Sequence, residues 1–404
     1  MIPLQSSTTK IECRLYTSFS DLEAHRAAWD EIAASAGAPI YMTFDWCRIW
    51  WEFYGRGREL AIFGVMADDT LAGVLPIYID GSSFWPFKVR IARLVGATDG
   101  PTKVLDPPLR RDIAATALRL VVARLLRERS CDLVSLGPVS ATSPSLEGLT
   151  ANQAGESNRV RLRQTGVLAY YDLSGRPEDY LATLGRSEQK HRRYDIRYLD
   201  RQGAEEALVG GAGTDIELEF HAFARMHTTD WNVLGRPGHF YAWPRAYEFH
   251  LALTKCFFRL DRLRLHKIRV GQDVISYDYA YAFGPAFFWE LRARSLDKRW
   301  AKISLGSCAL IFLLRHAVRE RAACLYAGIG SQEYKTRLGA KERPVVTIDI
   351  SPDDRLTGAF VGGYRLAYRV LETLYFKLWY MRIQPRLPKY FHRPIWKFWS
   401  KISI

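Results

Sequence analysis

Two carboxylates, Asp278 and Glu290, lie in neighbouring segments whose patterns predict strands. In residues 273–283, Asp278 shares one predicted strand face with small residues, while the tyrosines share the other face. After Gly284-Pro285, the segment AFFWELRARS puts Glu290 in a similar setting. A strand acid among small side chains leaves room for a ligand and can take a proton from it. Both acids are therefore candidate general bases, and the alternative is a structural pairing with Arg292 or Arg294.

A candidate anion site follows in the segment KRWAKISLGSCALIFLLRHAVRERA. Cations and a Ser-Leu-Gly turn precede an apolar helix that starts near Gly306 or Ser307. Backbone N–H groups and the dipole of a helix start attract a phosphate group. The candidate phosphate-binding residues are Lys302, Ser304, Leu305, Gly306 and Ser307. Cys308 has no persuasive histidine partner, so we expect a buried structural thiol.

A charged helix is predicted over residues 186–203, with a row of cations at Arg186, Lys190, Arg193, Arg197 and Arg201. Spacing by three or four residues puts these side chains on one helical face. A solvated face is one interpretation. The other is an anionic ligand, because the nearby acids cannot neutralise so many cations, and Arg193 is its candidate contact.

An aromatic segment over residues 231–243, with Trp231, His239, Tyr241 and Trp243, has the composition of a lid or acceptor-binding loop. Trp231 and Tyr241 are its candidate substrate contacts. His221 and His227 lie on the preceding predicted helix, six residues apart, which does not suit a shared metal ion. Each histidine fits an ordinary, partly buried position. His227 is also a candidate substrate contact because it lies next to the predicted lid.

The chain repeats one pattern twice. RELAIFGVMADDTLAGVLPIYI (58–79), a helical stretch and CDLVSLG (131–137) form the first copy. DRLRLHKIRVGQDVISYDYAYAF (261–283), a helical stretch and CLYAGIG (324–330) form the second. Each copy predicts a strand pair, a helix and a further strand, which indicates a duplicated lobe rather than a solenoid.

Local patterns predict further elements. We expect helices over residues 20–35, 45–54, 109–129 and 217–232, and strands over 60–67 and 71–79 joined by Asp68-Asp69. Ser20 is the expected cap of the first helix. Residues 140–158 are expected to be a surface loop before the second lobe.

The composition is that of a globular protein, with 404 residues, 48% hydrophobic and 13% aromatic content. Its six cysteines show neither zinc-ligand spacing nor a disulfide framework, so we expect a reducing compartment and no metal. There is no N-terminal apolar stretch of signal-peptide type and no run that would span a membrane. These features predict a cytoplasmic protein.

The net charge of +14 is concentrated at the C-terminus. Residues 361–404 contain nine Lys or Arg residues against one acid, Glu372, interleaved with aromatics such as Trp379, Trp396 and Trp399. Rings and cations together suit a membrane surface. The alternative is a tail that packs its rings on the body of the protein. Nucleic acid ranks lower because no recognised binding module accompanies the cations.

The order strand pair, SLG-helix, apolar strand and GSQEYKTRLG resembles the GNAT-like acyltransferases associated with bacterial cellulose and exopolysaccharide synthesis, the CelD/BcsL-like family. The basic residues at 190–193 and the segments PIYMTFDWCRIWWEFYG and GVLPIYI are also similar to that family. The resemblance covers roughly residues 11–350.

The resemblance implies an α/β fold with two GNAT-like lobes related to the Fem-type aminoacyltransferases, each a mixed, mostly antiparallel sheet with flanking helices. The expected domains are residues 1–160 as a structural lobe, 161–352 as the lobe with the donor and acceptor sites, and 353–404 as a basic aromatic segment. By analogy, the helix start at Ser304–Ser307 would receive the donor's pyrophosphate, and Tyr334 and Lys335 would lie near the donor or acceptor. Tyr334 is thereby a catalytic candidate.

The implied reaction moves an acyl group from acyl-CoA, with acetyl-CoA as the expected donor, to an amine or hydroxyl of a sugar, amine or lipid-linked acceptor. The Gly-rich donor loop of ordinary acetyltransferases is reduced here to Leu305-Gly306. Two alternatives therefore stay open. One is a Fem-like transferase that uses aminoacyl-tRNA, with the Arg186–Arg201 row as its footprint, and the other is a non-catalytic scaffold on a membrane-bound glycan-synthesis complex.

Overall fold

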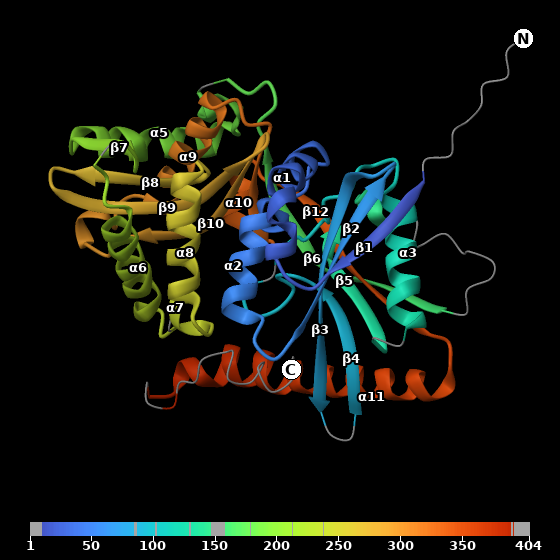
Figure 1. Cartoon of the computed structure of the whole chain (residues 1–404). Coiled ribbons are helices and arrows are strands. Elements are labelled where there is room, and N and C mark those ends of the chain that lie inside the picture. Colours follow the sequence, from blue (N-terminus) through green and yellow to red (C-terminus); the bar gives the residue numbers. More distant parts are fainter. Residues whose placement is uncertain are drawn as a thin grey trace, which may run out of the picture.

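A large mixed sheet organises the molecule. The computed structural model describes residues 10–388 and 391, except residues 85–86, 102, 129–130, 147–157, 178, 212 and 237. Within these residues a 12-stranded sheet has the order β1-β2-β3-β4-β5-β12-β6-β11-β10-β9-β8-β7, with helices on both faces (Figure 1). The predicted fold class, a mixed α/β structure with flanking helices, is confirmed.

The first half of the chain builds one end of this sheet. Asp68 and Asp69 form the turn between β2 and β3 with φ angles of 47° and 65°, the backbone conformation that tight hairpins require. The predicted strand pair is therefore present. Its elements are β1 (Ile11–Tyr16), η1 (Ser20–His25), α1 (Arg26–Ser35), η2 (Ile40–Met42), α2 (Phe44–Tyr54), β2 (Glu59–Ala67), β3 (Thr70–Phe84), β4 (Phe87–Leu94), α3 (Ala114–Arg127) and β5 (Leu133–Ser140).

The second half repeats the arrangement at the other end. Here β8, β9 and β10 are antiparallel neighbours, and β10 pairs in parallel with β11, as β4 does with β5. Its elements are η3 (Tyr180–Thr183), α5 (Arg186–Arg201), β7 (Ala204–Leu208), α6 (Ile216–Val233), α7 (His239–Ala242), α8 (Ala246–Arg259), β8 (Leu263–Val270), β9 (Asp273–Phe283), β10 (Ala286–Arg294), η4 (Lys298–Trp300), α9 (Leu305–Arg319), β11 (Cys324–Ile329) and α10 (Glu333–Arg337).

Two strands cross between the halves. β6 (Asn158–Asp172) ends the first half but pairs with β11. β12 (Lys341–Pro352) ends the second half but pairs with β5. β12 also pairs along its whole length with β6, from Asn158 to Tyr170. The expected boundary at 160/161 falls inside β6, so the two halves share a continuous sheet.

The two faces of β9 pack against different helices. Tyr277, Tyr279 and Tyr281 lie in the core that includes α6 and α8, whereas Ala280 lies in the core under α9. This is the alternation that the sequence predicted for residues 277–283, because successive strand side chains point to opposite faces.

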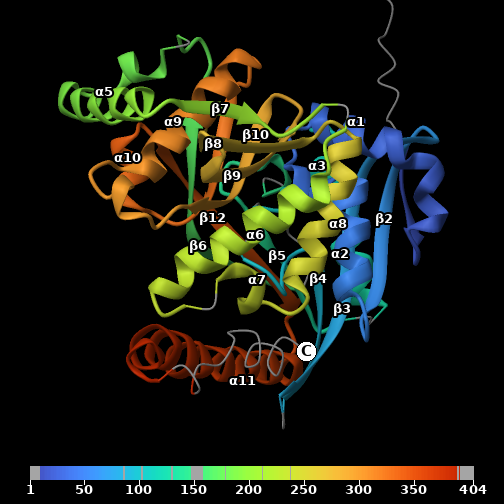
Figure 2. The same cartoon turned by 90° about the vertical axis from the view of Figure 1, so that its left-hand side faces the viewer.

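The C-terminal segment crosses beneath the sheet (Figures 1 and 2). It comprises α11 (Arg355–Leu371), the π-helix η5 (Glu372–Ile383) and η6 (Gln384–Arg386). Tyr364 accepts a hydrogen bond from Arg93 of β4 at 3.0 Å, so part of this segment packs on the body. Trp396 and Trp399 lie outside the described residues. In the part of the chain that the structure describes, no helix combines the length and apolar character needed to cross a bilayer.

Three local predictions need correction or have limits. The helix expected over 20–35 begins as a 3₁₀ turn, and Ser20 contacts Ser18 instead of capping it. The helix expected over 109–129 starts only at Ala114, because Arg110 donates to the carbonyl of Ala72 and so joins the edge of β3. Of the loop expected over 140–158, residues 147–157 lie outside the described residues.

Candidate active site

The strands β10 and β11 separate at the middle of the sheet. They pair only through Ala286–Phe288 and Cys324–Tyr326, and β10 also has an irregularity against β9 between Trp289 and Leu291. Beyond the paired section lies a cavity of about 510 Å³ that residues of both lobes line. Backbone groups that no neighbouring strand occupies can bind a ligand, so the separation creates a natural site.

Glu290 lies at the irregular point of β10 and on the wall of this cavity. Its side chain is only 2% exposed, and it accepts hydrogen bonds from the Tyr41 hydroxyl and the Lys103 ammonium. The ammonium also lies 5.0 Å from the centre of the Tyr41 ring. Burial, and then the Glu290 carboxylate, raise the pKa of Tyr41 well above its usual value. A carboxylate of lobe two is therefore held by two donors of lobe one.

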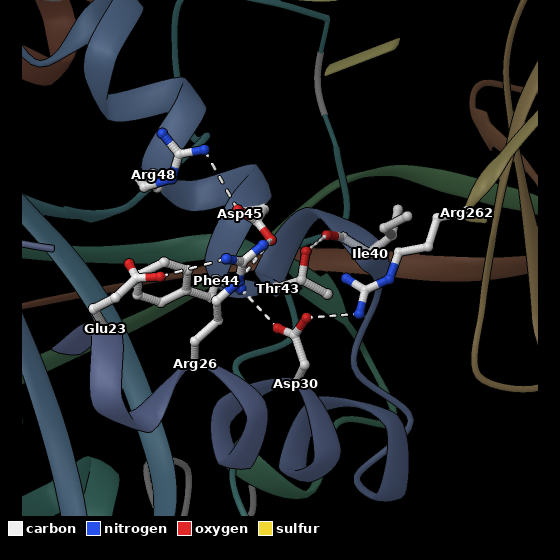
Figure 3. Close-up of polar contacts among 9 residues, drawn as sticks. All are labelled: Glu23, Arg26, Asp30, Ile40, Thr43, Phe44, Asp45, Arg48 and Arg262. Carbon is white, nitrogen blue, oxygen red and sulfur yellow. Dashed lines mark hydrogen bonds and ion pairs between the residues drawn. The ribbon is translucent and has the colours of Figure 1, made fainter. Parts of the chain in front are cut away.

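The segment that carries Tyr41 is itself fixed by polar contacts (Figure 3). Asp30 accepts from the backbone N–H of Phe44 at 2.9 Å and forms an ion pair with Arg262 of lobe two at 2.7 Å. Asp45 is almost fully buried and pairs with Arg26 at 2.6 Å. These contacts hold η2 against the second lobe and so orient Tyr41 toward Glu290.

Three neutral histidines lie at the cavity: His227 and His239 line it, and His250 lies behind His239. His227 Nδ1 donates to the Arg292 carbonyl at 2.7 Å, which leaves Nε2 to accept from the His239 backbone N–H at 3.4 Å. His239 and His250 join through their Nε2 atoms at 2.8 Å. Burial lowers the pKa of His227, lowers that of His239 far below its usual value, and lowers that of His250 to about 3. His227 thus lines the cavity as a satisfied, uncharged residue.

The predicted lid residues divide between two places. Trp231 lines the cavity together with Arg236, whose guanidinium lies 5.7 Å from the Trp231 ring centre, and with Tyr380 of η5. Tyr241 is 64% exposed and is not among the cavity residues. Segment 231–243 therefore does border the site, but Tyr241 points elsewhere.

Asp278 and Glu290 do not share a site. Asp278 is fully buried, and its Oδ1 accepts from Trp289 Nε1 at 2.8 Å while its Oδ2 has no hydrogen-bond partner among the described residues. Burial raises the pKa of Asp278 to about 7, and the Arg292 charge opposes this shift. Asp278 is not on the cavity wall. The similar setting expected for both acids is wrong because their side chains point to opposite faces of the sheet. Trp289 lies opposite Ala280 in the core under α9, on the face that Asp278 shares, so the next residue, Glu290, points to the other face.

Tyr334 and Lys335 are neighbours within α10, but their side chains have different surroundings. The Arg292 guanidinium lies 4.8 Å from the Tyr334 ring centre, next to Asp278 rather than in the cavity. Lys335 lines the cavity and donates to the Ala327 carbonyl at 2.6 Å. Burial, with help from the Arg292 charge, lowers the pKa of Lys335 to about 8.

Polar side chains surround the N-terminus of α9. The backbone N–H of Ser304 donates to Asp195 at 3.3 Å, and the hydroxyls of Ser304 and Ser307 are 2.8 Å apart. A Cβ on Gly306 would come 3.0 Å from a guanidinium nitrogen of Arg292. Leu305 is buried and Lys302 is exposed. These residues lie outside the cavity wall, with the Arg292 side chain over the helix start.

Arg193 belongs to a separate basic hollow of about 450 Å³ between α5 and α9. It lies there with Arg197, Arg315 and Arg319, and it pairs with Asp179 at 3.6 Å. The structure therefore adds two cations of α9 to the predicted row on α5.

Part of the chain matches a known family. Residues 190–336 match the acetyltransferase (GNAT) domain. This match supports an acyltransferase and implies an acyl-CoA donor. No curated protein matches the chain.

Solved structures show the same fold. The structure of FemX is similar with a TM-score of 0.59 and 9% identity, covering 84% of this chain and 96% of that chain. A conserved protein of unknown function from Bacteroides thetaiotaomicron is similar with a TM-score of 0.50 and 12% identity, covering 84% of this chain and 100% of that chain. At such identities the similarity concerns the fold.

Sequence reasoning missed Lys103 and Tyr41, which lie in lobe one, whereas His239 and Trp243 of the predicted lid do line the cavity. No local pattern marks Lys103, since it lies in a loop far from Glu290 in the sequence. Tyr41 stands in the segment PIYMTFDWC, one of the segments on which the expected resemblance to the exopolysaccharide-associated transferases rested, and that was the available signal. Among the residues that the structure describes, no group of three or more His, Cys, Asp or Glu residues could hold a metal ion.

Proposed function

We propose that this protein transfers an acyl group from acyl-CoA to an amine or hydroxyl in the inter-lobe cavity, in polysaccharide or cell-envelope biosynthesis. The observation that carries the proposal is Glu290, a buried carboxylate on the wall of the cavity where β10 and β11 separate. The GNAT match of residues 190–336 supports the acyl-CoA donor. The resemblance to the exopolysaccharide-associated family supports the class of acceptor.

The chemistry requires alignment and one proton acceptor, because a thioester is already reactive. The acceptor nitrogen or oxygen attacks the thioester carbon, and its proton passes to Glu290 directly or through water. The C–S bond then breaks, and the departing thiolate takes up this proton and leaves as the CoA thiol. Lys103 and Tyr41 hold the carboxylate in place. Backbone N–H groups at the irregular part of β10 would stabilise the oxyanion.

For the donor, we propose that its pyrophosphate binds at the start of α9, with Lys302, Ser304, Leu305, Gly306 and Ser307. Arg292 adds a cation at this point because its guanidinium lies over Gly306. Asp195 opposes an anion there, since its carboxylate already accepts from Ser304 N–H. Lys335 lies on the cavity side, where the acyl group would be held.

Calorimetric titration with acetyl-CoA and a longer acyl-CoA tests the donor. We expect saturable binding that Lys302→Ala weakens by about tenfold, the effect of one lost charge-assisted phosphate contact. No binding to either donor would contradict the proposal and leave aminoacyl-tRNA or a scaffold role.

Turnover distinguishes the two candidate bases. Glu290→Gln should lower kcat by roughly 10²–10⁴-fold, the usual contribution of a general base, and leave donor binding unchanged. Asp278→Asn is the matched comparison, because Asp278 is the other predicted base and lies away from the cavity wall. A loss in Asp278→Asn alone would assign the base to Asp278, and full turnover in both would remove these carboxylates from the mechanism.

A second candidate is a transferase that uses aminoacyl-tRNA. The observation that favours it is the hollow with Arg193, Arg197, Arg315 and Arg319, a set of cations suited to phosphodiesters. Steep salt dependence of RNA binding, reduced by Arg315→Gln, would support this candidate over acyl-CoA.

A further inference from the structure

The underside of the molecule carries an unusual combination of elements. α11 and η5 run beneath the sheet, and the ends of β3 and β4 extend past α11 on the same side (Figures 1 and 2). We call the exposed side of α11 and η5, together with the hairpin end of β3 and β4, the basal surface.

One face of α11 is occupied by the body of the protein. Val361 and Tyr364 are buried in a small core with Val89 and Ile91 of β4, and Arg365 forms an ion pair with Asp349 at 3.2 Å. This packing fixes the rotation of α11 about its axis. The side chains on its other faces are therefore presented to solvent in a defined way.

A second face of α11 and η5 is apolar and exposed. Leu356 is 75% exposed, Leu366 64% and Leu374 55%. From Leu366 onward the exposed apolar positions recur every three or four residues, so they form one stripe along α11 and η5, whereas Leu356 lies ten residues earlier. The exposed apolar residues of the stripe are Leu366, Val370, Leu374, Leu378 and Met381. A contiguous apolar stripe of this length on a surface marks an interaction site.

The stripe is accompanied by positive charge. Arg355, Arg369, Lys377 and Arg382 lie on the same two helices, whose acid Glu372 is paired with Lys377 at 4.0 Å. Apolar residues beside cations on an interfacial helix match the two layers of an anionic membrane surface, acyl chains and phosphate headgroups.

The hairpin supplies an independent observation. β3 and β4 pair as far as Phe84 and Phe87, and Lys88 of β4, next to this end of the hairpin, is exposed. A cation at this position adds to the positive charge that attracts anionic lipids. The hairpin and α11 are far apart in the sequence, yet the fold brings them to the same side.

We propose that the basal surface docks on a bilayer that contains anionic lipids, with α11 and η5 lying in the interface. The described helices cannot span the bilayer, so the association is peripheral. η5 also contributes Tyr380 to the wall of the inter-lobe cavity. Docking would thus bring that cavity close to the membrane, whatever reaction takes place there.

Co-sedimentation of the full chain with vesicles tests the proposal. One set contains phosphatidylcholine alone, and the other also contains phosphatidylglycerol. The triple variant Leu366→Ser, Leu374→Ser, Leu378→Ser should lower the partition coefficient for the anionic vesicles by at least about tenfold. The matched control, Leu15→Ser, Leu120→Ser, Leu218→Ser, changes leucines that are also exposed but lie elsewhere, and it should bind like the parent.

Charge is tested separately. Arg369→Gln, Lys377→Gln, Arg382→Gln should reduce binding to anionic vesicles by about a hundredfold and abolish the preference for them. Far-UV circular dichroism and thermal melting confirm that each variant is folded. Absence of parent binding, or equal binding by the stripe and control variants, would overturn the proposal. So would loss of binding only on removing residues 387–404, or a parent dimer that the stripe substitutions dissociate without any vesicle binding.

Discussion

At the scale of single residues, Glu290 and Asp278 differ in the face of the sheet that each side chain occupies. The same local pattern surrounds Asp278 and Glu290 in the sequence, yet only Glu290 reaches the cavity and meets Lys103 and Tyr41. Asp278 remains among buried groups, where its carboxyl has a pKa of about 7. The two acids are therefore distinguished by backbone geometry, which their residue type does not reveal.

A residue-scale prediction concerns Gly137, the last residue of the first repeat. Its φ is 142°, and a Cβ there would lie 2.8 Å from the Val346 carbonyl oxygen and 2.9 Å from Thr347 Cα. Gly137→Ala should lower the free energy of unfolding by about 2–3 kcal/mol, since strain and a backbone clash act together. Urea denaturation measures this change.

The matching glycine of the second repeat, Gly330, also has a positive φ, of 125°, but its nearest neighbour is the flexible Gln332 side chain at 3.3 Å. Gly330→Ala should cost less than Gly137→Ala. Gly210→Ala is the control, because its Cβ meets nothing within 4 Å. Equal stability of all three variants would contradict the argument.

At the scale of elements, α7 and α8 are joined by the His239–His250 hydrogen bond. Burial depresses the pKa of His250 from 6.5 to about 3 in the folded protein. The unfolded chain therefore binds this proton as the pH falls below 6.5, while the folded chain does not. The contribution of His250 to the free energy of unfolding is therefore fully present above pH 6.5 and is lost as the pH falls toward 3.

The free energy of unfolding should fall by about 2–4 kcal/mol less between pH 6.5 and 4 in His250→Gln than in the parent protein. Denaturant titrations at a series of pH values measure this difference. The exposed residue His191 offers the control, His191→Gln. Asp278 acts in the opposite direction, because its raised pKa lets the folded state hold a proton between pH 3.8 and about 7. The comparison of parent and variant isolates His250, and parallel pH curves would refute its role.

At the scale of the whole molecule, β6 and β12 make the halves interdependent. Without β12 the edge of β5 is unpaired, and without β6 the edge of β11 is unpaired. We predict that residues 1–160 and 161–352, expressed separately, lack the near-ultraviolet circular dichroism of packed aromatic residues. Co-expression of the complementary halves should restore it, and the intact chain should unfold in one transition. A cooperative melt of either half alone would show that the lobes are independent domains.

The duplicated lobes, the hairpin turn at Asp68-Asp69 and the tyrosine face of β9 were all predictable from the sequence. Each of these features follows from residues within a few positions of one another, because the periods of helices and strands are visible over such short distances. The start of α3 was not predictable, because the preceding segment is drawn to β3 by hydrogen bonds that no helical signal reveals. The functional roles of Glu290, Lys302 and Lys335, the cytoplasmic location and the domain division remain predictions.

By itself, the sequence determined the repeated strand-pair, helix and strand units and the concentration of charge and aromatic residues at the C-terminus. Only the tertiary structure decided that β6 and β12 cross between the lobes and that the β3–β4 hairpin lies beside α11. It also decided that Lys103 contacts Glu290, a residue 187 positions away in the sequence. The physical reason is that such contacts depend on how two lobes pack through buried surfaces. That packing is a property of the whole sheet, and no short segment of the chain encodes it.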